Sequence, residues 1–128
     1  MTYDEFNHFC KSLPATTYVM QWNQSHVWKV GGKVFAIGGL GKTQWRGQNT
    51  PPAFTFKTSD LNFDFLSDKS GYRPAPYFAS RGMKWIQCED SSASSEDELV
   101  YYLKESYRLV SLGLTKKKQK DLGLNQPE

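Results

Sequence analysis

Two adjacent glycines, Gly31-Gly32, constrain the fold of this chain more than any other feature. They separate two short runs, residues 26–30 and 33–37, that are rich in β-branched and aromatic side chains. Glycine adopts positive φ without steric cost, and tight two-residue hairpin turns require positive φ. The sequence therefore predicts an antiparallel β-hairpin centred on this pair.

A two-residue turn also fixes which residues of the hairpin face each other. Counting outward from the glycines pairs Val30 with Lys33, Lys29 with Val34, Trp28 with Phe35, Val27 with Ala36, and His26 with Ile37. We expect the core face to carry Trp28, Val30, Phe35 and Ile37. The other face then carries Val27, Lys29, Val34 and Ala36, and its small residues and single cation could lie open to a partner.

Other strands and helices follow from apolar spacing and from capping residues. Strands are predicted over residues 16–22, 53–57 and 83–88, and 71–77 is expected to be an extended loop. Thr2 with Glu5 predicts the start of an N-terminal helix, Ser59 caps a short middle helix over 60–66, and Ser95 with Glu98 opens a C-terminal helix. These elements predict an α+β fold with about five strands.

The length of 128 residues predicts a single domain, which we place at 1–114. Residues 115–128 carry a run of lysines and are expected to form a basic, mobile tail. No stretch is long and apolar enough to span a membrane, and the acidic N-terminus lacks the plan of a signal peptide. We therefore expect a cytoplasmic protein without a cofactor, in which Cys10 and Cys88 are free, buried thiols.

The charges are segregated along the chain, although the net charge is only +3. Residues 6–59 and 69–88 contain lysines and arginines but neither Asp nor Glu. This pattern predicts one positive and one negative surface, and a positive surface is typical of nucleic-acid binding. The alternative is that charges cluster by chance in a short chain and contribute only to solubility.

One segment, residues 36–43, nearly matches the phosphate-binding pattern G-x-x-x-x-G-K-[ST], with Ala36 in the first glycine position. A true phosphate-binding loop continues into a helix whose N-terminus holds the phosphate. Here Gly47 and Pro51-Pro52 exclude a useful helix, and the preceding strand belongs to a hairpin. We interpret the match as fortuitous. Because His8 and His26 also have ordinary structural roles open to them, we expect a protein that is not an enzyme.

Four blocks in order resemble the MmcQ/YjbR family. They are Trp28-Lys29-Val30-Gly31-Gly32-Lys33-Val34-Phe35-Ala36, then Phe56-Lys57-Thr58, then Arg73-Pro74-Ala75-Pro76-Tyr77 with Lys84-Trp85, and finally Ser106-Tyr107-Arg108-Leu109-Val110 ahead of Lys116-Lys117-Lys118. The likeness extends over about residues 3–120. It implies a compact bacterial cytoplasmic domain with an antiparallel sheet, of the kind called a double-wing DNA-binding motif. The long segment 38–52 departs from the family pattern.

Two functions remain open at this point. In the first, the chain is a DNA-binding protein that contacts phosphates through a basic sheet and its loops. The residues expected to take part are Lys29, Lys33, Lys42, Trp45, Arg46, Lys57, Arg73, Tyr77, Arg81 and Lys84. Of the tryptophans, Trp28 and Trp85 are expected in the core, whereas Trp45 is the ring that could stack on a base.

In the second, the chain binds a protein or an anionic small molecule and no nucleic acid. The acidic C-terminal helix and the loop 73–77 would form the contact surface, and an anionic metabolite would lie beside Arg73, Tyr77 and Lys84. A continuous stripe of cations favours nucleic acid, whereas cations around a closed pocket favour a small ligand.

Overall fold

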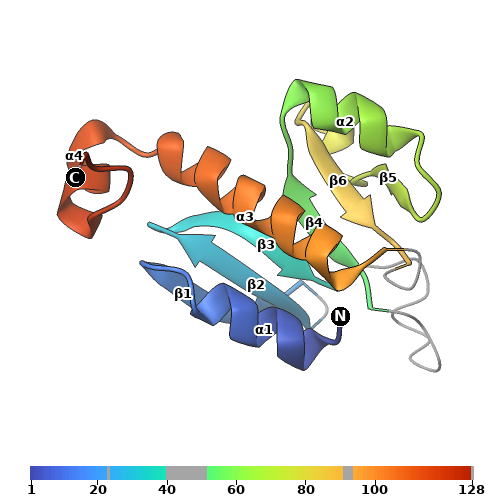
Figure 1. Cartoon of the computed structure of the whole chain (residues 1–128), viewed down its shortest axis with the longest axis horizontal. Helices are drawn as coiled ribbons and strands as arrows, with labels where there is room; N and C mark the ends of the chain where they lie inside the picture. Colours follow the sequence, from blue (N-terminus) through green and yellow to red (C-terminus); the bar gives the residue numbers. More distant parts are fainter. Residues whose placement is uncertain (23, 40–51, 91–93, 128) are drawn as a thin grey trace.

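A six-stranded antiparallel sheet lies at the centre of the described part of this computed structural model (Figure 1). Its strands are β1 (Thr16–Gln21), β2 (Ser25–Val30), β3 (Lys33–Gly38), β4 (Phe54–Lys57), β5 (Tyr72–Pro74) and β6 (Trp85–Cys88), in the order β1-β2-β3-β4-β6-β5. The structure describes residues 1–22, 24–39, 52–90 and 94–127. The predicted α+β fold is confirmed. The strand beyond the expected five is β5, a short edge strand where an extended loop was predicted.

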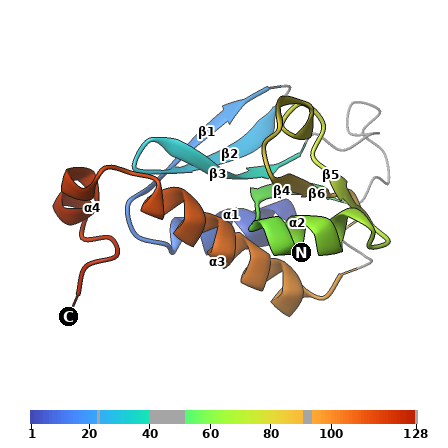
Figure 2. The same cartoon turned by 90° about the horizontal axis from the view of Figure 1, so that it is seen from above.

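Three helices, α1 (Tyr3–Lys11), α2 (Asp60–Ser67) and α3 (Glu96–Leu112), lie on one side of the sheet (Figure 2). Each begins at the predicted cap: the side chains of Thr2, Ser59 and Ser95 accept backbone N–H groups three residues ahead. Glu5 completes the capping box of α1 by accepting the N–H of Thr2. Within the described ranges, none of the helices combines the length and the apolar character needed to cross a membrane.

The core fills the space between these helices and the sheet. Phe6 and Cys10 of α1 and Leu99 and Leu103 of α3 pack against a row of sheet residues that includes Trp28, Phe54, Phe56 and Ile86. Burial of this apolar surface is the main term that stabilises the fold. Cys10 and Cys88 are buried and free, as predicted, and burial raises the pKa of both thiols.

The predicted register of the hairpin is correct next to the glycines and wrong beyond them. Val30 pairs with Lys33 and Lys29 with Val34, but Trp28 then pairs with Ala36 and Val27 with Ile37. A β-bulge at Phe35 inserts one unpaired residue into β3. Ala36 therefore joins Phe35 in the core, and Ile37 moves to the outer face of the sheet, away from the helices.

The segment expected to be a mobile tail is instead folded. Helix α4 (Lys116–Leu122) begins at Thr115, whose side chain accepts the N–H of Lys118. The Gln119 amide donates to the carbonyl oxygens of Leu114 and Leu112, and Leu114 and Leu124 are buried in the core cluster. The lysine run predicts a charged tail, whereas the Thr115 cap and the two buried leucines determine the structure of this segment.

Candidate nucleic-acid interface

The sheet topology brings four predicted lysines to one end of the sheet. Lys33 follows the turn between β2 and β3, and Lys29 lies two residues before it. Lys57 is the last residue of β4 and pairs with Trp85, so Lys84 lies just beyond that pair. We call this edge, made by the turn Gly31-Gly32 and by residues 57–58 and 84–85, the hairpin end of the sheet. Strands far apart in sequence therefore present cations together.

Lys57 and Lys84 line one hollow at the hairpin end. Its volume is about 410 Å³, and Thr58, Ser59, Asp60, Met83 and Trp85 complete the lining. The two strand ends are joined because both the backbone N–H and the hydroxyl of Thr58 donate to the carbonyl oxygen of Lys84. The Lys84 ammonium lies 4.7 Å from the centre of the Phe63 ring. Asp60 is the carboxylate in this hollow, and neither lysine makes an ion pair with it or with another described carboxylate.

Helix α3 fixes the backbone that carries Lys57. The bulge at Phe35 leaves β3 and β4 without a regular pair at this point. The buried hydroxyl of Ser106 fills the gap by accepting the N–H of Lys57 at 2.8 Å and donating to the carbonyl oxygen of Phe35 at 2.6 Å. Buried backbone groups need such partners, so Ser106 holds the end of β4 in place.

The segment after β5 adds an exposed aromatic ring and an arginine to the same end. Phe78 stacks on the buried Trp85 with ring centres 4.7 Å apart, which anchors the segment to β6. Tyr77 is 62% exposed, and its φ of 73° is rare for a residue other than glycine. The Arg81 guanidinium lies 4.4 Å from the centre of the Tyr77 ring. The pair forms a flat cationic surface of a kind that suits phosphates and bases.

Lys29 and Lys57 lie on the outer face of the sheet, because their neighbours Trp28, Val30 and Phe56 belong to the core. They are two strands apart, a separation of about 10 Å between backbones. Lys33 is exposed on the turn and donates to the carbonyl oxygen of Gly113, where α3 ends.

Helix α4 adds lysines that the sequence analysis did not include in the site. Lys118 lines a hollow of about 400 Å³ together with Gly31, Gly32 and Lys33. The run Lys116-Lys117-Lys118 is the sequence signal for these cations, although its composition predicts a mobile tail. The lysines of this helix therefore extend the positive charge of the hairpin end.

Arg73 has a different environment from the other predicted residues. It lies on the edge strand β5, opposite Gln87 of β6. Its guanidinium donates to the Gln87 side chain at 2.9 and 2.7 Å and approaches the Glu89 carboxylate at 3.3 Å. Its charge is therefore compensated inside the protein. Lys42, Trp45 and Arg46 lie outside the described residues.

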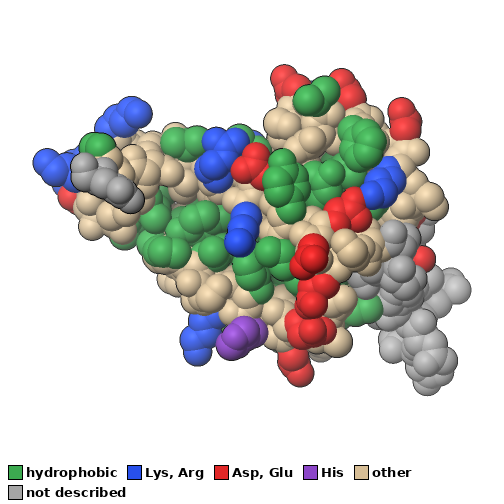
Figure 3. Space-filling model, viewed as in Figure 1, with side chains coloured by type: hydrophobic (Ala, Val, Ile, Leu, Met, Phe, Trp, Pro, Cys, Tyr) green, Lys and Arg blue, Asp and Glu red, His purple; other side chains and the backbone are tan. Residues whose placement is uncertain are grey.

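A group of five carboxylates lies at the opposite end of the sheet. Helices α1 and α3 both begin there, with Asp4 and Glu5 in the first turn of one and Glu96, Asp97 and Glu98 in that of the other. Figure 3 shows a red cluster where α1 and α3 start and further red side chains over α2, whereas blue side chains lie around α4 and also nearer the centre of the view. The acids of these two first turns are thus separated from the lysines of the hairpin end, although Asp60 lies among those lysines and Asp121 pairs with Lys117 on α4.

Comparison with known proteins places this architecture in a family. The crystal structure of protein DR2400 from Deinococcus radiodurans, described as a DUF419 domain, is similar, with a TM-score of 0.79 and 23% identity over 96% of this chain and 88% of that one. A protein from Pseudomonas syringae has a TM-score of 0.67 and 17% identity over 85% of this chain and 98% of its own. These likenesses show the fold alone, and no curated protein matches the sequence. A model of the YjbR family matches residues 11–109, and the chain therefore belongs to the YjbR family.

Proposed function

We propose that this protein binds nucleic acid through the hairpin end of the sheet, by contacting backbone phosphates. The observation that carries the proposal is the convergence of Lys29, Lys33, Lys57 and Lys84, from three different parts of the chain, at one end of the sheet. None of the four is paired with a described carboxylate. Unpaired surface cations are free to replace the counterions that surround phosphates.

The shape of the charged surface supports this role over a closed ligand site. The cations run from α4 and the turn, past Lys29 and Lys57, to Lys84 and Arg81. They line two separate hollows along the hairpin end and do not converge on one cavity. Phosphate contacts of this kind give affinity without sequence preference. Tyr77 supplies an exposed ring for a base, so we extend the proposal to single strands as well as duplex. Arg73 is left out, because Glu89 already compensates its charge.

The role we propose is binding without catalysis, in the cytoplasm. Both cysteines are buried with raised pKa values, which disfavours the reactive thiolate. In the described ranges, no three His, Cys, Asp or Glu side chains come together as a metal-binding group.

The direct test is fluorescence anisotropy of labelled duplex and single-stranded oligonucleotides at low and at physiological salt. We expect the affinity of the native chain to fall steeply as the salt concentration rises. At equal salt, Lys29→Glu should bind more weakly than the native chain. Asp60→Asn should bind more tightly than the native chain, because it removes the carboxylate from the hollow between Lys57 and Lys84. Lys104→Glu, an exposed lysine on α3, is the matched control. Failure to bind at low salt contradicts the proposal.

A second candidate rests on the hollow of about 410 Å³ itself, which could hold an anionic small molecule between Lys57 and Lys84. Inorganic phosphate and mononucleotides, added as competitors in the same assay, separate the two. The small ligand would be favoured if one of these compounds displaces the labelled oligonucleotide at a low concentration, while salt of equal ionic strength does not. Competition that follows ionic strength alone would favour the nucleic acid.

A further inference from the structure

Strand β1 is an edge of the sheet that carries no charge, proline or bulge to oppose pairing with a further strand. It forms six consecutive pairs with β2, and in the described part of the chain no strand covers its other side. Its sequence, Thr16-Thr17-Tyr18-Val19-Met20-Gln21, contains no charge and no proline, and its pairing with β2 has no bulge. Natural edge strands are normally blunted by such features.

The opposite edge of the same sheet shows the contrast. Strand β5 has three residues, ends in Pro74 and carries the charged Arg73. On β1 and directly after it, in contrast, large apolar side chains are about half exposed: Tyr18 at 43%, Met20 at 51% and Trp22 at 48%. An uncharged edge with exposed apolar side chains is suited to pairing with another strand.

We propose that two copies of this chain form a dimer by antiparallel pairing of their β1 strands, which joins both sheets into one. The backbone indicates the register. The N–H of Gly31 donates to the carbonyl oxygen of Ala15, just before the first β1–β2 pair. Hydrogen-bonded pairs alternate along an antiparallel ladder. The N–H and C=O groups of Thr16, Tyr18 and Met20 therefore point away from β2, toward the free edge.

One symmetric register uses all three of these residues. Placing Tyr18 opposite Tyr18 of the second copy also sets Thr16 opposite Met20 on the same face, and Thr17 opposite Val19 on the other. The pairs are aromatic, apolar or β-branched, and no like charges meet. A twofold interface requires such a self-complementary patch.

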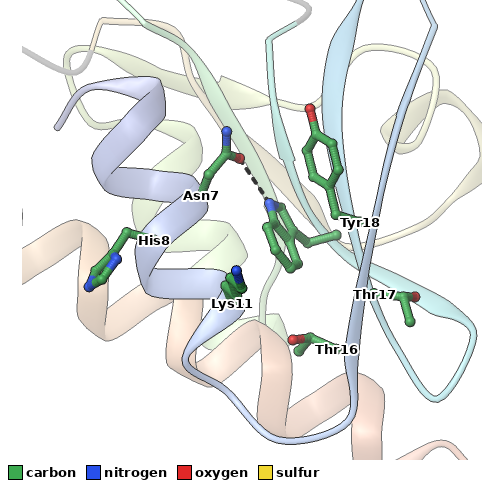
Figure 4. Close-up of a pocket in the computed structure, with 7 residues that line it drawn as sticks. Asn7, His8, Lys11, Thr16, Thr17 and Tyr18 are labelled. Carbon is green, nitrogen blue, oxygen red and sulfur yellow. Dashed lines mark hydrogen bonds between the residues drawn. The ribbon is translucent and has the colours of Figure 1, made fainter.

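The Tyr18 side chain lies at the groove between α1 and β1, where hydrogen bonds and ring contacts fix its position (Figure 4). The groove, of about 550 Å³, is lined by residues of α1, by the first half of β1 and by Trp28. The Tyr18 hydroxyl hydrogen-bonds the His26 imidazole at 2.8 Å, and its ring lies 5.2 Å from that of Trp28. The Trp28 indole in turn donates to the Asn7 side chain at 2.9 Å, the dashed line in Figure 4. In the dimer, the Tyr18 ring of each copy covers the open side of the other's groove.

The charges of α1 fit the same arrangement. The start of α1 lies near His26, where Tyr3 contacts that ring, and its end lies near Thr16, which donates to the carbonyl oxygen of Cys10. Twofold pairing of β1 therefore brings the end of α1, with Lys11, toward the start of α1 of the second copy, with Asp4 and Glu5. Opposite charges then face each other across the junction, which favours this orientation.

The test is sedimentation velocity of the full chain from micromolar to near-millimolar concentration. We expect a dimer for the native protein. Tyr18→Lys and Tyr18→Glu should each be monomeric, because like charges would lie directly opposite. An equimolar mixture of the two variants should form a heterodimer, because opposite charges then meet. Leu61→Lys, at an apolar side chain 79% exposed on α2, is the control that stays dimeric.

Met20→Lys gives an independent check. Because the Met20 side chain is half exposed, its replacement should leave the fold intact and weaken the dimer. Circular dichroism verifies folding of each variant. A native chain that sediments as a monomer at every concentration overturns the proposal and leaves β1 as an edge for a strand of another protein. Dimers of Tyr18→Lys and Tyr18→Glu as stable as the native one overturn it as well.

Discussion

The hydroxyl of Ser106 on α3 donates a 2.6 Å hydrogen bond to the carbonyl oxygen of Phe35, the bulged residue of β3. The same hydroxyl accepts the N–H of Lys57, so one helix residue bridges two strands where their own ladder is interrupted. This contact links the irregularity of the hairpin to the position of a lysine in the proposed interface.

Ser106→Ala is expected to destabilise the protein. The substitution leaves the Phe35 carbonyl and the Lys57 N–H without this partner in a buried site, at a cost of about 1–3 kcal/mol for each group left unsatisfied. Urea unfolding measures the loss. Ser67→Ala is the matched control, because the Ser67 hydroxyl bonds only to Phe63 within its own helix. Equal losses in the two variants would show that the bridge has no special role.

His26 should make the stability depend on pH. Its Nδ1 lies within hydrogen-bond distance of the Tyr18 hydroxyl and the Asn7 amide, both of which can donate to a neutral ring. Burial lowers the pKa of the His26 imidazole, against the opposing effect of Asp4. The folded chain therefore binds the proton more weakly than the unfolded chain. The contribution of His26 is full above its unfolded pKa of about 6.5 and is lost as the pH falls toward the lowered folded value.

The measurement uses His8→Gln as the background, so that His26 is the one histidine that remains in the chain. Unfolding free energies are compared at about pH 8 and about pH 5, on either side of the histidine range. The loss of stability between them should be smaller when His26→Gln is added. Carboxylates such as Glu5 and Glu105, whose pKa values are lowered, titrate in both proteins and cancel in the comparison. An unchanged loss would exclude His26 as a source.

Gly31→Ala should be more damaging than Gly32→Ala. Both glycines have positive φ, 57° and 86°, so an alanine is strained at either place. A Cβ on Gly31 would also lie 2.6 Å from a methyl carbon of Leu114, whereas one on Gly32 meets only the Lys118 ammonium at 3.8 Å. The extra cost, about 1–3 kcal/mol for an overpacked site, is read from urea unfolding. Equal effects would mean that the C-terminal segment does not pack on the turn.

Much of the fold follows from local signals in the sequence. The glycine pair, the caps at Thr2, Ser59 and Ser95, and the apolar spacing of the helices depend on neighbouring residues, and the structure confirms them. The bulge at Phe35 could not be predicted in this way. It depends on the partner strand β4 and on Ser106 of α3, which lie far along the chain.

The four lysines of the proposed interface could be singled out in the sequence, but the surface that they form could not. The cations of residues 29–33, 57 and 84 come together only because β6 inserts beside β4 and leaves β5 at the edge. The sequence likewise gives no sign that Arg73 is compensated, since Glu89 and Gln87 reach it across the β5–β6 pair. Helix α4 was not predicted, because a run of lysines resembles a solvated tail. The helix is held to the core by Leu114 and Leu124, which flank it in the sequence.

The most direct test of the nucleic-acid proposal is the slope of the logarithm of the binding constant against the logarithm of salt concentration. Each phosphate contact contributes about −0.9 to the slope for duplex DNA. We expect a steep slope for the native chain, smaller in magnitude by about 2 in the double variant Lys57→Gln with Lys84→Gln, and unchanged in Lys104→Gln. A native slope near zero, or one that the double variant leaves unaltered, would contradict binding through the hairpin end.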